Sequence, residues 1–131
     1  MAELKLIVVT PEETAFECQT TFVALPMHDG ELGVAASHAP MIGRLGYGEL
    51  RVKQGGGTTR YYIDGGFVQI ADNVVSVLTN RAVPAGKLDG SVLEEELKSA
   101  IVAPAHSDEG LDARERAVSQ ARAQLRVARA K

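Results

Sequence analysis

Short runs of β-prone residues alternate with turn residues along the first 80 positions of this chain. Leu50 and Val52 alternate with charged neighbours, which is typical of a strand with one face in water. The run around Ile7 is apolar on both sides, as in a strand buried between two layers. Turn signals recur about every 8–12 residues, a spacing typical of a sandwich or barrel. The runs are residues 4–10, 20–26, 33–37, 49–54, 60–64, 67–71 and 74–80. With hairpin turns at Gly55–Gly57 and Asp72–Asn73, they predict an antiparallel β-sandwich over residues 1–84.

A helical period replaces this alternation after Pro84. Ser91 and Glu94 have the spacing of a capping box, and Pro104 ends the run. The apolar residues between them recur at helical spacing: Leu93, Leu97 and Ile101. We expect a first helix here, after a linker over residues 85–90.

A second helix is predicted to begin near Asp112, after the polar loop at 105–110. Its apolar stripe is narrow and made of small residues: Ala117, Ala121, Leu125 and Ala128. Alanine buries little area, so an antiparallel two-helix hairpin over residues 91–131 should be only marginally stable by itself. Such a hairpin is suited to docking and undocking.

The amino-acid composition limits the classes of function that this chain is expected to have. The 131 residues suit one domain with an appendage. With no Trp and only three each of Phe and Tyr, the chain has little material for stacking on bases or sugars, which argues against a nucleic-acid or lectin function. Cys18 is the single cysteine and is expected to be a small core residue. No apolar run approaches the ~20 residues of a membrane span, and the amino terminus lacks the features of a signal peptide. These features predict a soluble cytoplasmic protein.

Charge is distributed unevenly along the chain. Residues 1–110 carry 8 basic and 15 acidic residues, 8 − 15 = −7, whereas residues 111–131 carry 6 basic and 2 acidic residues, 6 − 2 = +4. A basic carboxy-terminal segment on an acidic body can dock on that body or bind an acidic partner. An ordinary solvated helix face would have the same composition, so both interpretations stay open.

Catalytic and metal motifs are nearly absent. Ser37 and His38 are neighbours in an extended segment and point to opposite faces, so they cannot form a nucleophile–base pair. The three histidines are far apart and have no zinc-site spacing. The glycine triplet lacks the Lys-Ser/Thr of a phosphate loop. We expect no catalytic residue, no metal site and no cofactor.

The segment from Asp29 to Pro40 reads DGELGVAASHAP. Gly30 and Gly33 bracket two residues, which predicts a glycine turn that pushes Glu31 outward before a short strand. This motif resembles the β-domain of the ε subunit of F-type ATP synthases. The motifs YGELRV (47–52), YYIDGGFVQIADNVVSVLTNRAV (61–83) and AQLRVA (123–128) stand in the order and spacing of that family, and the resemblance covers essentially the whole chain.

The resemblance implies a non-catalytic subunit of the central stalk, which binds the γ subunit and the c-ring and so couples ring rotation to ATP synthesis, with the catalytic α and β subunits as further partners. Such a subunit reaches the cytoplasmic face of the cell membrane only through the complex and binds no nucleic acid. The positions that match the family's c-ring and γ contacts are Glu31 and His38, with Leu32 and Met41 as apolar neighbours. In the family the hairpin restrains ATP hydrolysis, and basic residues of its second helix face the catalytic β subunit. The matching residues here are Arg114, Arg116, Arg122, Arg126 and Arg129.

Nucleotide-binding members of the family resemble one another in a Leu/Ile-Asp motif followed by Arg-Ala. Leu88 and Asp89 match, but Val92 and Leu93 stand where Arg and Ala are expected. In the second helix, Gln120 and Gln124 replace arginines that face phosphate, which removes the charge-assisted contacts. The chain therefore matches only part of a nucleotide site. Two other classes stay open: a free-standing β-sandwich binding module for a small ligand or glycan, and an enzyme.

Overall fold

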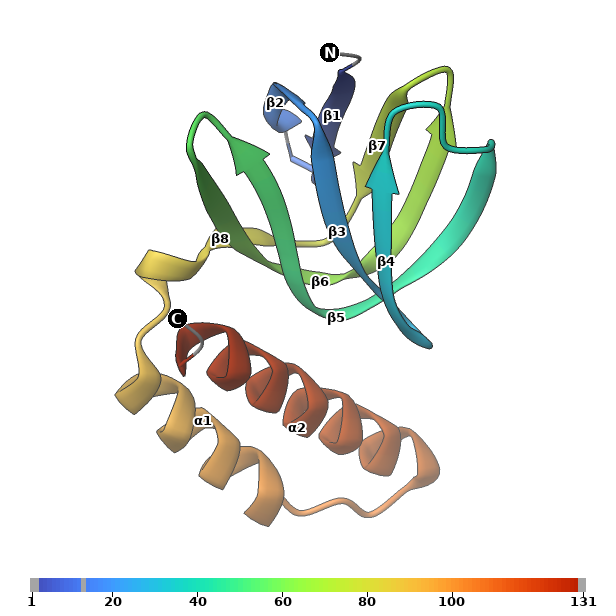
Figure 1. Ribbon diagram of the computed structural model, residues 1–131. Coiled ribbons are helices and arrows are strands. Elements are labelled where there is room, and N and C mark those ends of the chain that lie inside the picture. Colours follow the sequence, from blue (N-terminus) through green and yellow to red (C-terminus); the bar gives the residue numbers. More distant parts are fainter. Residues whose placement is uncertain (1–2, 13, 130–131) are drawn as a thin grey trace.

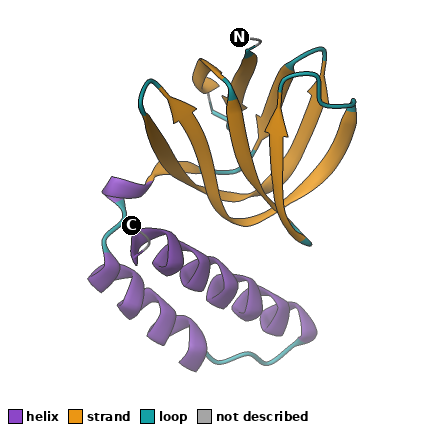
Figure 2. Cartoon of the chain, viewed as in Figure 1, coloured by secondary structure: helices purple, strands orange, loops and turns teal. Residues whose placement is uncertain are grey.

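The computed structural model describes residues 3–12 and 14–129, and the expected ends of the sandwich and of the hairpin, at 1–2 and 130–131, lie outside them. A curved sheet forms the amino-terminal part, and two antiparallel helices lie beneath it (Figure 1). The strands are β1 Leu4–Val9, β2 Thr14–Thr20, β3 Phe22–Met27, β4 Gly30–Ala35, β5 Met41–Gln54, β6 Gly57–Ala71, β7 Val74–Leu78 and β8 Ala82–Pro84. The helices are the 3-10 turn η1 Ala85–Lys87, α1 Gly90–Val102 and α2 Asp108–Arg129 (Figure 2).

The strands form a single sheet that folds over into two layers, in the order β2-β1-β7-β6-β5-β3-β4, with β8 also paired to β6. β5 and β6 are long enough to belong to both layers, and both bend where the layers meet (Figure 1). At the bend, Gly66 has φ +110°, and a Cβ there would lie 1.9 Å from the carbonyl oxygen of Leu78. Only glycine can adopt this conformation without a clash, so the bend between the two layers requires glycine at position 66.

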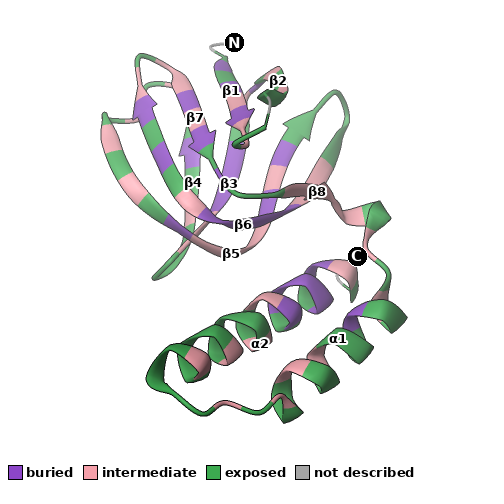
Figure 3. Ribbon diagram, turned by 180° about the vertical axis from the view of Figure 1, so that it is seen from behind, coloured by how far each residue is buried: buried purple, intermediate pink, exposed green. Residues whose placement is uncertain are grey.

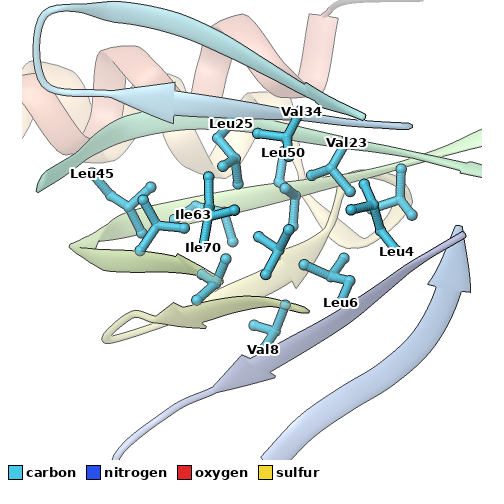
Figure 4. Packing of buried hydrophobic residues seen from close by; sticks show 14 residues of the cluster. Leu4, Leu6, Val8, Val23, Leu25, Val34, Leu45, Leu50, Ile63 and Ile70 are labelled. Atoms are coloured by element: carbon cyan, nitrogen blue, oxygen red, sulfur yellow. The ribbon is translucent and has the colours of Figure 1, made fainter. Parts of the chain in front are cut away.

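The core lies between the two layers and is made almost entirely of aliphatic side chains (Figure 4). Leu50 and Val52 are fully buried, as their alternation predicted. The prediction that the first strand is buried on both faces is wrong. Leu4, Leu6 and Val8 of β1 are fully buried, but Ile7 lies on the other face and is partly exposed. The reason is topological: β1 belongs to one layer of the sandwich, so only one of its faces meets the core.

Several strand predictions need correction. The sequence runs missed β2, β8 and the first half of β5, and they divided β6 at Gly65–Gly66, where the strand bends and continues. β2 carried a signal, since Phe16 and Cys18 alternate with polar neighbours and face the core. β1 pairs with β7 in parallel, whereas β1–β2, β3–β4 and β5–β6 are antiparallel. The predicted tight turn at Asp72 and Asn73 is confirmed, because both residues have positive φ values, 52° and 61°.

The GELG segment is a strand, which corrects the predicted glycine turn. β4 begins at Gly30, and the turn lies just before it, at His28 and Asp29. Gly33 lies within the strand beneath the ring of Phe22, where a Cβ would come within 3.0 Å of the ring. Close packing of the aromatic ring, rather than a turn, therefore accounts for this glycine.

The helix caps lie earlier than predicted. Asp89, rather than Ser91, caps α1: its Oδ1 accepts a hydrogen bond from the Ser91 amide at 2.9 Å and a longer one from the Val92 amide at 3.4 Å. α2 begins at Asp108 instead of near Asp112, because the hydroxyl of Ser107 accepts a hydrogen bond from the Gly110 amide at 3.0 Å. Asp89 and Ser107 thus accept hydrogen bonds from backbone amides in the first turn of each helix, which have no partner within the helix itself.

α2 packs on two sides, against α1 and against the sheet at β5 and β6. Its buried side chains therefore form a wider band than the predicted stripe (Figure 3): Ala121, Ala123, Gln124, Leu125 and Val127. Ala117, a predicted stripe residue, is exposed. In α1, Leu93 is buried as expected, but Ile101 is 47% exposed near the end of the helix. The hairpin is thus held mainly by the carboxy-terminal half of α2.

Candidate functional site

Glu31 lies on β4 and is bound to Arg51 of β5. The two guanidinium nitrogens of Arg51 donate to the two carboxylate oxygens of Glu31 at 2.6 and 2.8 Å. Both side chains are partly exposed, at 51% for Glu31 and 39% for Arg51. The hydrogen bonds from Arg51 lower the pKa of Glu31, so the carboxylate stays ionised. The outward position predicted for Glu31 is confirmed, and the structure adds that its charge is paired within the chain.

The other predicted interface residues are spread along β4 and the loop after it. Leu32 and Met41 are partly buried and pack against the core, so they present only part of their surface to a partner. His38 is partly exposed in the loop between β4 and β5, at the opposite end of β4 from Glu31. Ser37, beside it, has φ +67°, and its amide donates to Asn73 Oδ1 at 2.7 Å. A non-glycine residue in this conformation is uncommon, and the Asn73 contact stabilises it.

Exposed apolar side chains on the sandwich mark surfaces that the sequence analysis missed. Phe67 and Leu78 are opposite each other on β6 and β7 and are 58% and 50% exposed. They border a groove of about 990 Å³ at the bend of the sheet, which Arg44 and Tyr47 also line. Ile42, next to Met41, is 76% exposed. Strand alternation could have found Phe67, since Val68 and Ile70 face the core and place it on the outer face.

The five arginines of α2 divide into partnered and unpartnered residues. Arg114 donates to the Ala103 carbonyl oxygen at 3.4 Å, and Arg129 forms an ion pair with Glu94 of α1. The side chains of the remaining three make no hydrogen bond or ion pair with another residue among 3–12 and 14–129: Arg116, Arg122 and Arg126. Arg122, Arg126 and Arg129 also line a shallow hollow of about 580 Å³ beside α1. The helix thus presents unneutralised positive charge to its surroundings.

The residues that partly match a nucleotide site are engaged in structural contacts. Asp89 caps α1, and hydrogen bonds from Ser91 lower its pKa. Leu88 packs against the apolar cluster around Tyr62. Gln120 Nε2 donates to Asp64 Oδ1 at 3.0 Å, and Gln124 is buried against the sandwich. The carboxyl group of Asp64 therefore lies beside Gln120, one of the two positions at which nucleotide-binding relatives are expected to carry arginine.

The residues considered as candidate catalytic or metal-binding groups do not lie together in one site. His38 Nδ1 lies 2.7 Å from the carbonyl oxygen of Ala39, the next residue along the chain. Cys18 is half-buried, and burial raises its pKa, which favours the thiol over the reactive thiolate. Over residues 3–12 and 14–129, no three His, Cys, Asp or Glu side chains gather closely enough to hold a metal ion. Within the same residues, neither α1 nor α2 has the length and apolar character needed to cross a membrane.

Comparison with known proteins decides the family. The sequence family described as "ATP synthase, Delta/Epsilon chain, beta-sandwich domain" matches residues 3–85. The chain is 48% identical to the ATP synthase epsilon chain of Rhodopirellula baltica over 126 residues, which cover 96% of this chain and 98% of the relative. The chain belongs to the ATP synthase epsilon family. The match extends past the sandwich into the helices, so the family includes both parts of this fold.

A second epsilon-family relative, the ATP synthase epsilon chain of Granulibacter bethesdensis, is 36% identical over 98% of this chain and 99% of its own. Among solved structures, the chain is similar to one in the OSCP/F1/c-ring complex of the Euglena gracilis mitochondrial ATP synthase. That likeness has a TM-score of 0.82 at 26% identity and covers 93% of this chain and 79% of the other. A chain of a solved ATP synthase complex therefore has this fold.

Proposed function

We propose that this chain is a non-catalytic subunit of the central stalk, which binds the γ subunit and the c-ring and so couples ring rotation to ATP synthesis. The observation that carries the proposal is the match of sandwich and hairpin together to ATP synthase epsilon chains. This match favours a stalk subunit over a free-standing binding module or an enzyme. The subunit would be held at the cytoplasmic face of the cell membrane through its partners.

The apolar surface around Phe67 and Leu78 is our candidate for the γ interface. Two large apolar side chains, each at least half exposed, border a groove wide enough to receive partner side chains. Stable interfaces place such residues at a desolvated centre within a polar rim. The γ subunit must stay attached as the rotor turns, and an apolar centre supports an interface of that kind.

The surface around Glu31 is our candidate for the c-ring. Its partner there would be a polar, basic loop of the ring, and the carboxylate of Glu31 is exposed enough to share its charge between Arg51 and that loop. A charged contact of this kind sets orientation more than affinity. Leu32, next to Glu31 on β4, would contribute the exposed part of its side chain. Met41 and Ile42 begin β5 directly after the loop that holds His38, and they would add an apolar contact beside His38, where Ile42 is 76% exposed. His38, at the far end of β4, would then contact γ or the edge of the ring.

The hairpin would restrain ATP hydrolysis through the basic surface of α2. Arg116, Arg122 and Arg126 have no partner of opposite charge among the described residues, so they are available to an acidic segment of the catalytic β subunit. Extended end to end, two helices of these lengths would reach roughly 50 Å along the stalk. Release of α2 from the sandwich is a precondition for that contact.

Co-purification from solubilised membranes tests the γ assignment. The Phe67→Ala/Leu78→Ala variant should remain folded yet be recovered with the γ subunit in much lower yield than the wild-type chain. Val102→Ala is the matched control, because Val102 is 77% exposed on α1, away from the groove. Normal recovery of the double variant would exclude this surface as the γ interface. Absence of the wild-type chain from the purified ATP synthase would exclude the proposed function itself.

A further inference from the structure

A buried carboxyl group lies between the sandwich and α2. Asp64, on β6 beside the bend, is only 6% exposed. Its Oδ1 accepts hydrogen bonds from the hydroxyl of Tyr62 at 2.8 Å and from Nε2 of Gln120 at 3.0 Å. No ion pair joins Asp64 to a Lys or Arg in the parts of the chain that the structure describes. The carboxyl group therefore depends on neutral donors.

The two donors depend differently on the position of the hairpin. Tyr62 is two residues away on the same strand and stays beside Asp64 whether or not α2 is docked. Burial and the neighbouring Asp64 raise the pKa of Tyr62, so its hydroxyl keeps the proton that it donates. Gln120 is 56 residues away on α2 and reaches Asp64 only when the helix is docked. Gln120 is thus the donor that α2 brings when it covers the carboxyl group.

The rest of the contact between α2 and the sandwich is made mainly by small apolar side chains and by the buried Gln124 beside Tyr62. Ala123 and Val127 pack against Tyr62, and Nη2 of Arg60 donates to the Val127 carbonyl oxygen at 2.7 Å. Small apolar side chains contribute little burial energy. Since burying a carboxylate without enough donors is costly, one lost hydrogen bond here can change whether the helix stays docked.

We propose that Asp64 and Gln120 form a latch that sets the docking of the hairpin on the sandwich. α2 can cover the Asp64 carboxylate because Gln120 donates to it. Without the Gln120 amide, the carboxylate is better hydrated with the helix released, so the hairpin undocks. Neutralising Asp64 removes that penalty and lets the helix stay docked even when Gln120 is absent. The size of the effect of losing Gln120 therefore depends on the charge of residue 64.

Hydrogen exchange of the full-length chain, followed by mass spectrometry, measures the docking. In Gln120→Leu, the amides of α2 should exchange roughly ten- to a hundredfold faster than in the wild type, because the carboxylate loses a donor. The amides of β5 and β6 should exchange at the wild-type rate, since the sandwich stays folded. Ser119→Leu is the matched control, because Ser119 is exposed on the same helix, and it should leave both rates unchanged.

The decisive variant combines Gln120→Leu with Asp64→Asn, which should return α2 exchange to near the wild-type rate. Wild-type exchange in Gln120→Leu alone would overturn the latch. Failure of Asp64→Asn to restore slow exchange would also overturn it, because Gln120 would then act through packing alone. Equal acceleration in β5 and β6 would show general destabilisation instead of undocking. Gln120→Ala, which adds no bulk, repeats the test if the leucine variant does not fold.

Discussion

Glu31 and Arg51 face each other across β3, the strand that lies between theirs in the sheet. Their two-point contact spans β3, where Ala24 is opposite Arg51 and is only 1% exposed. The carboxylate of Glu31, which was predicted from the sequence to contact a partner, is therefore held in a fixed orientation before binding. Pre-organisation of this kind lowers the entropy lost on binding.

Glu31→Gln should weaken the coupling of proton flow to ATP synthesis in membranes, because the neutral side chain cannot attract a basic loop of the c-ring. Arg51→Gln is the matched comparison: it breaks the same ion pair but keeps the carboxylate, so coupling should fall less than in Glu31→Gln. Raised salt should reduce the difference between wild type and Glu31→Gln through screening. Equal coupling in wild type and Glu31→Gln would remove Glu31 from the interface.

The Glu31–Arg51 pair also makes a testable contribution to pH-dependent stability. Arg51 lowers the pKa of Glu31 in the folded chain below its ordinary value of 4.5, so the contribution is present above that value and is lost as pH falls through the lowered folded pKa. Because both side chains are partly exposed, it should be under about 1 kcal/mol. Urea unfolding of wild type and Glu31→Gln should differ at neutral pH and converge in acid. A constant difference across this range would contradict the assignment.

Gly66→Ala should destabilise the sandwich by about 3 kcal/mol or more, because φ is +110° and a Cβ would overlap the Leu78 carbonyl oxygen. Gly57→Ala is the matched control: a Cβ there meets nothing within 4 Å, so the change should stay within about 0.5 kcal/mol. Thermal or urea unfolding measures both. A folded Gly66→Ala chain with wild-type stability would show that the bend tolerates a side chain.

Millimolar ATP should not raise the melting temperature of the isolated chain. Asp64 lies beside Gln120 and repels phosphate, while Asp89 is committed to capping α1. A ligand at 100 times its dissociation constant stabilises the native state by about 2.7 kcal/mol, which a melting curve detects easily. Sodium phosphate at the same ionic strength is the control. A saturable increase specific to ATP would establish a nucleotide site.

Deleting residues 88–131 should leave assembly and proton coupling intact and raise ATP hydrolysis by the membrane-bound complex. The sandwich keeps the proposed docking surfaces, whereas the basic face of α2 is lost. Changing Arg114, Arg116, Arg122, Arg126 and Arg129 together to Gln should reproduce most of the increase, and higher salt should mimic part of it. Hydrolysis no faster than in the intact enzyme would make the hairpin a stabilising strut instead of a brake.

The sequence determined the features that depend on near neighbours. Alternation over two residues placed Leu50 and Val52 in the core, and helical spacing located both helices, because these periods follow from the backbone geometry of each element alone. The sequence motifs also indicated the family, which the comparisons confirmed. The cap of α1 was placed two residues late because Asp89 and Ser91 are both good cap residues, and the local sequence does not rank them.

Tertiary structure decided the contacts between distant residues. Gly33 is glycine because the ring of Phe22 lies over it, and Gly66 because β7 passes close by, although sequence alone suggested a turn at Gly33 and a break between two strands at Gly66. Asp64 gained a donor 56 residues away only because α2 folds back onto β6. The outward position of Phe67 became a candidate interface only when the sheet bent and formed a groove beside it. Such contacts depend on how strands and helices come together in space, and no local period encodes that arrangement.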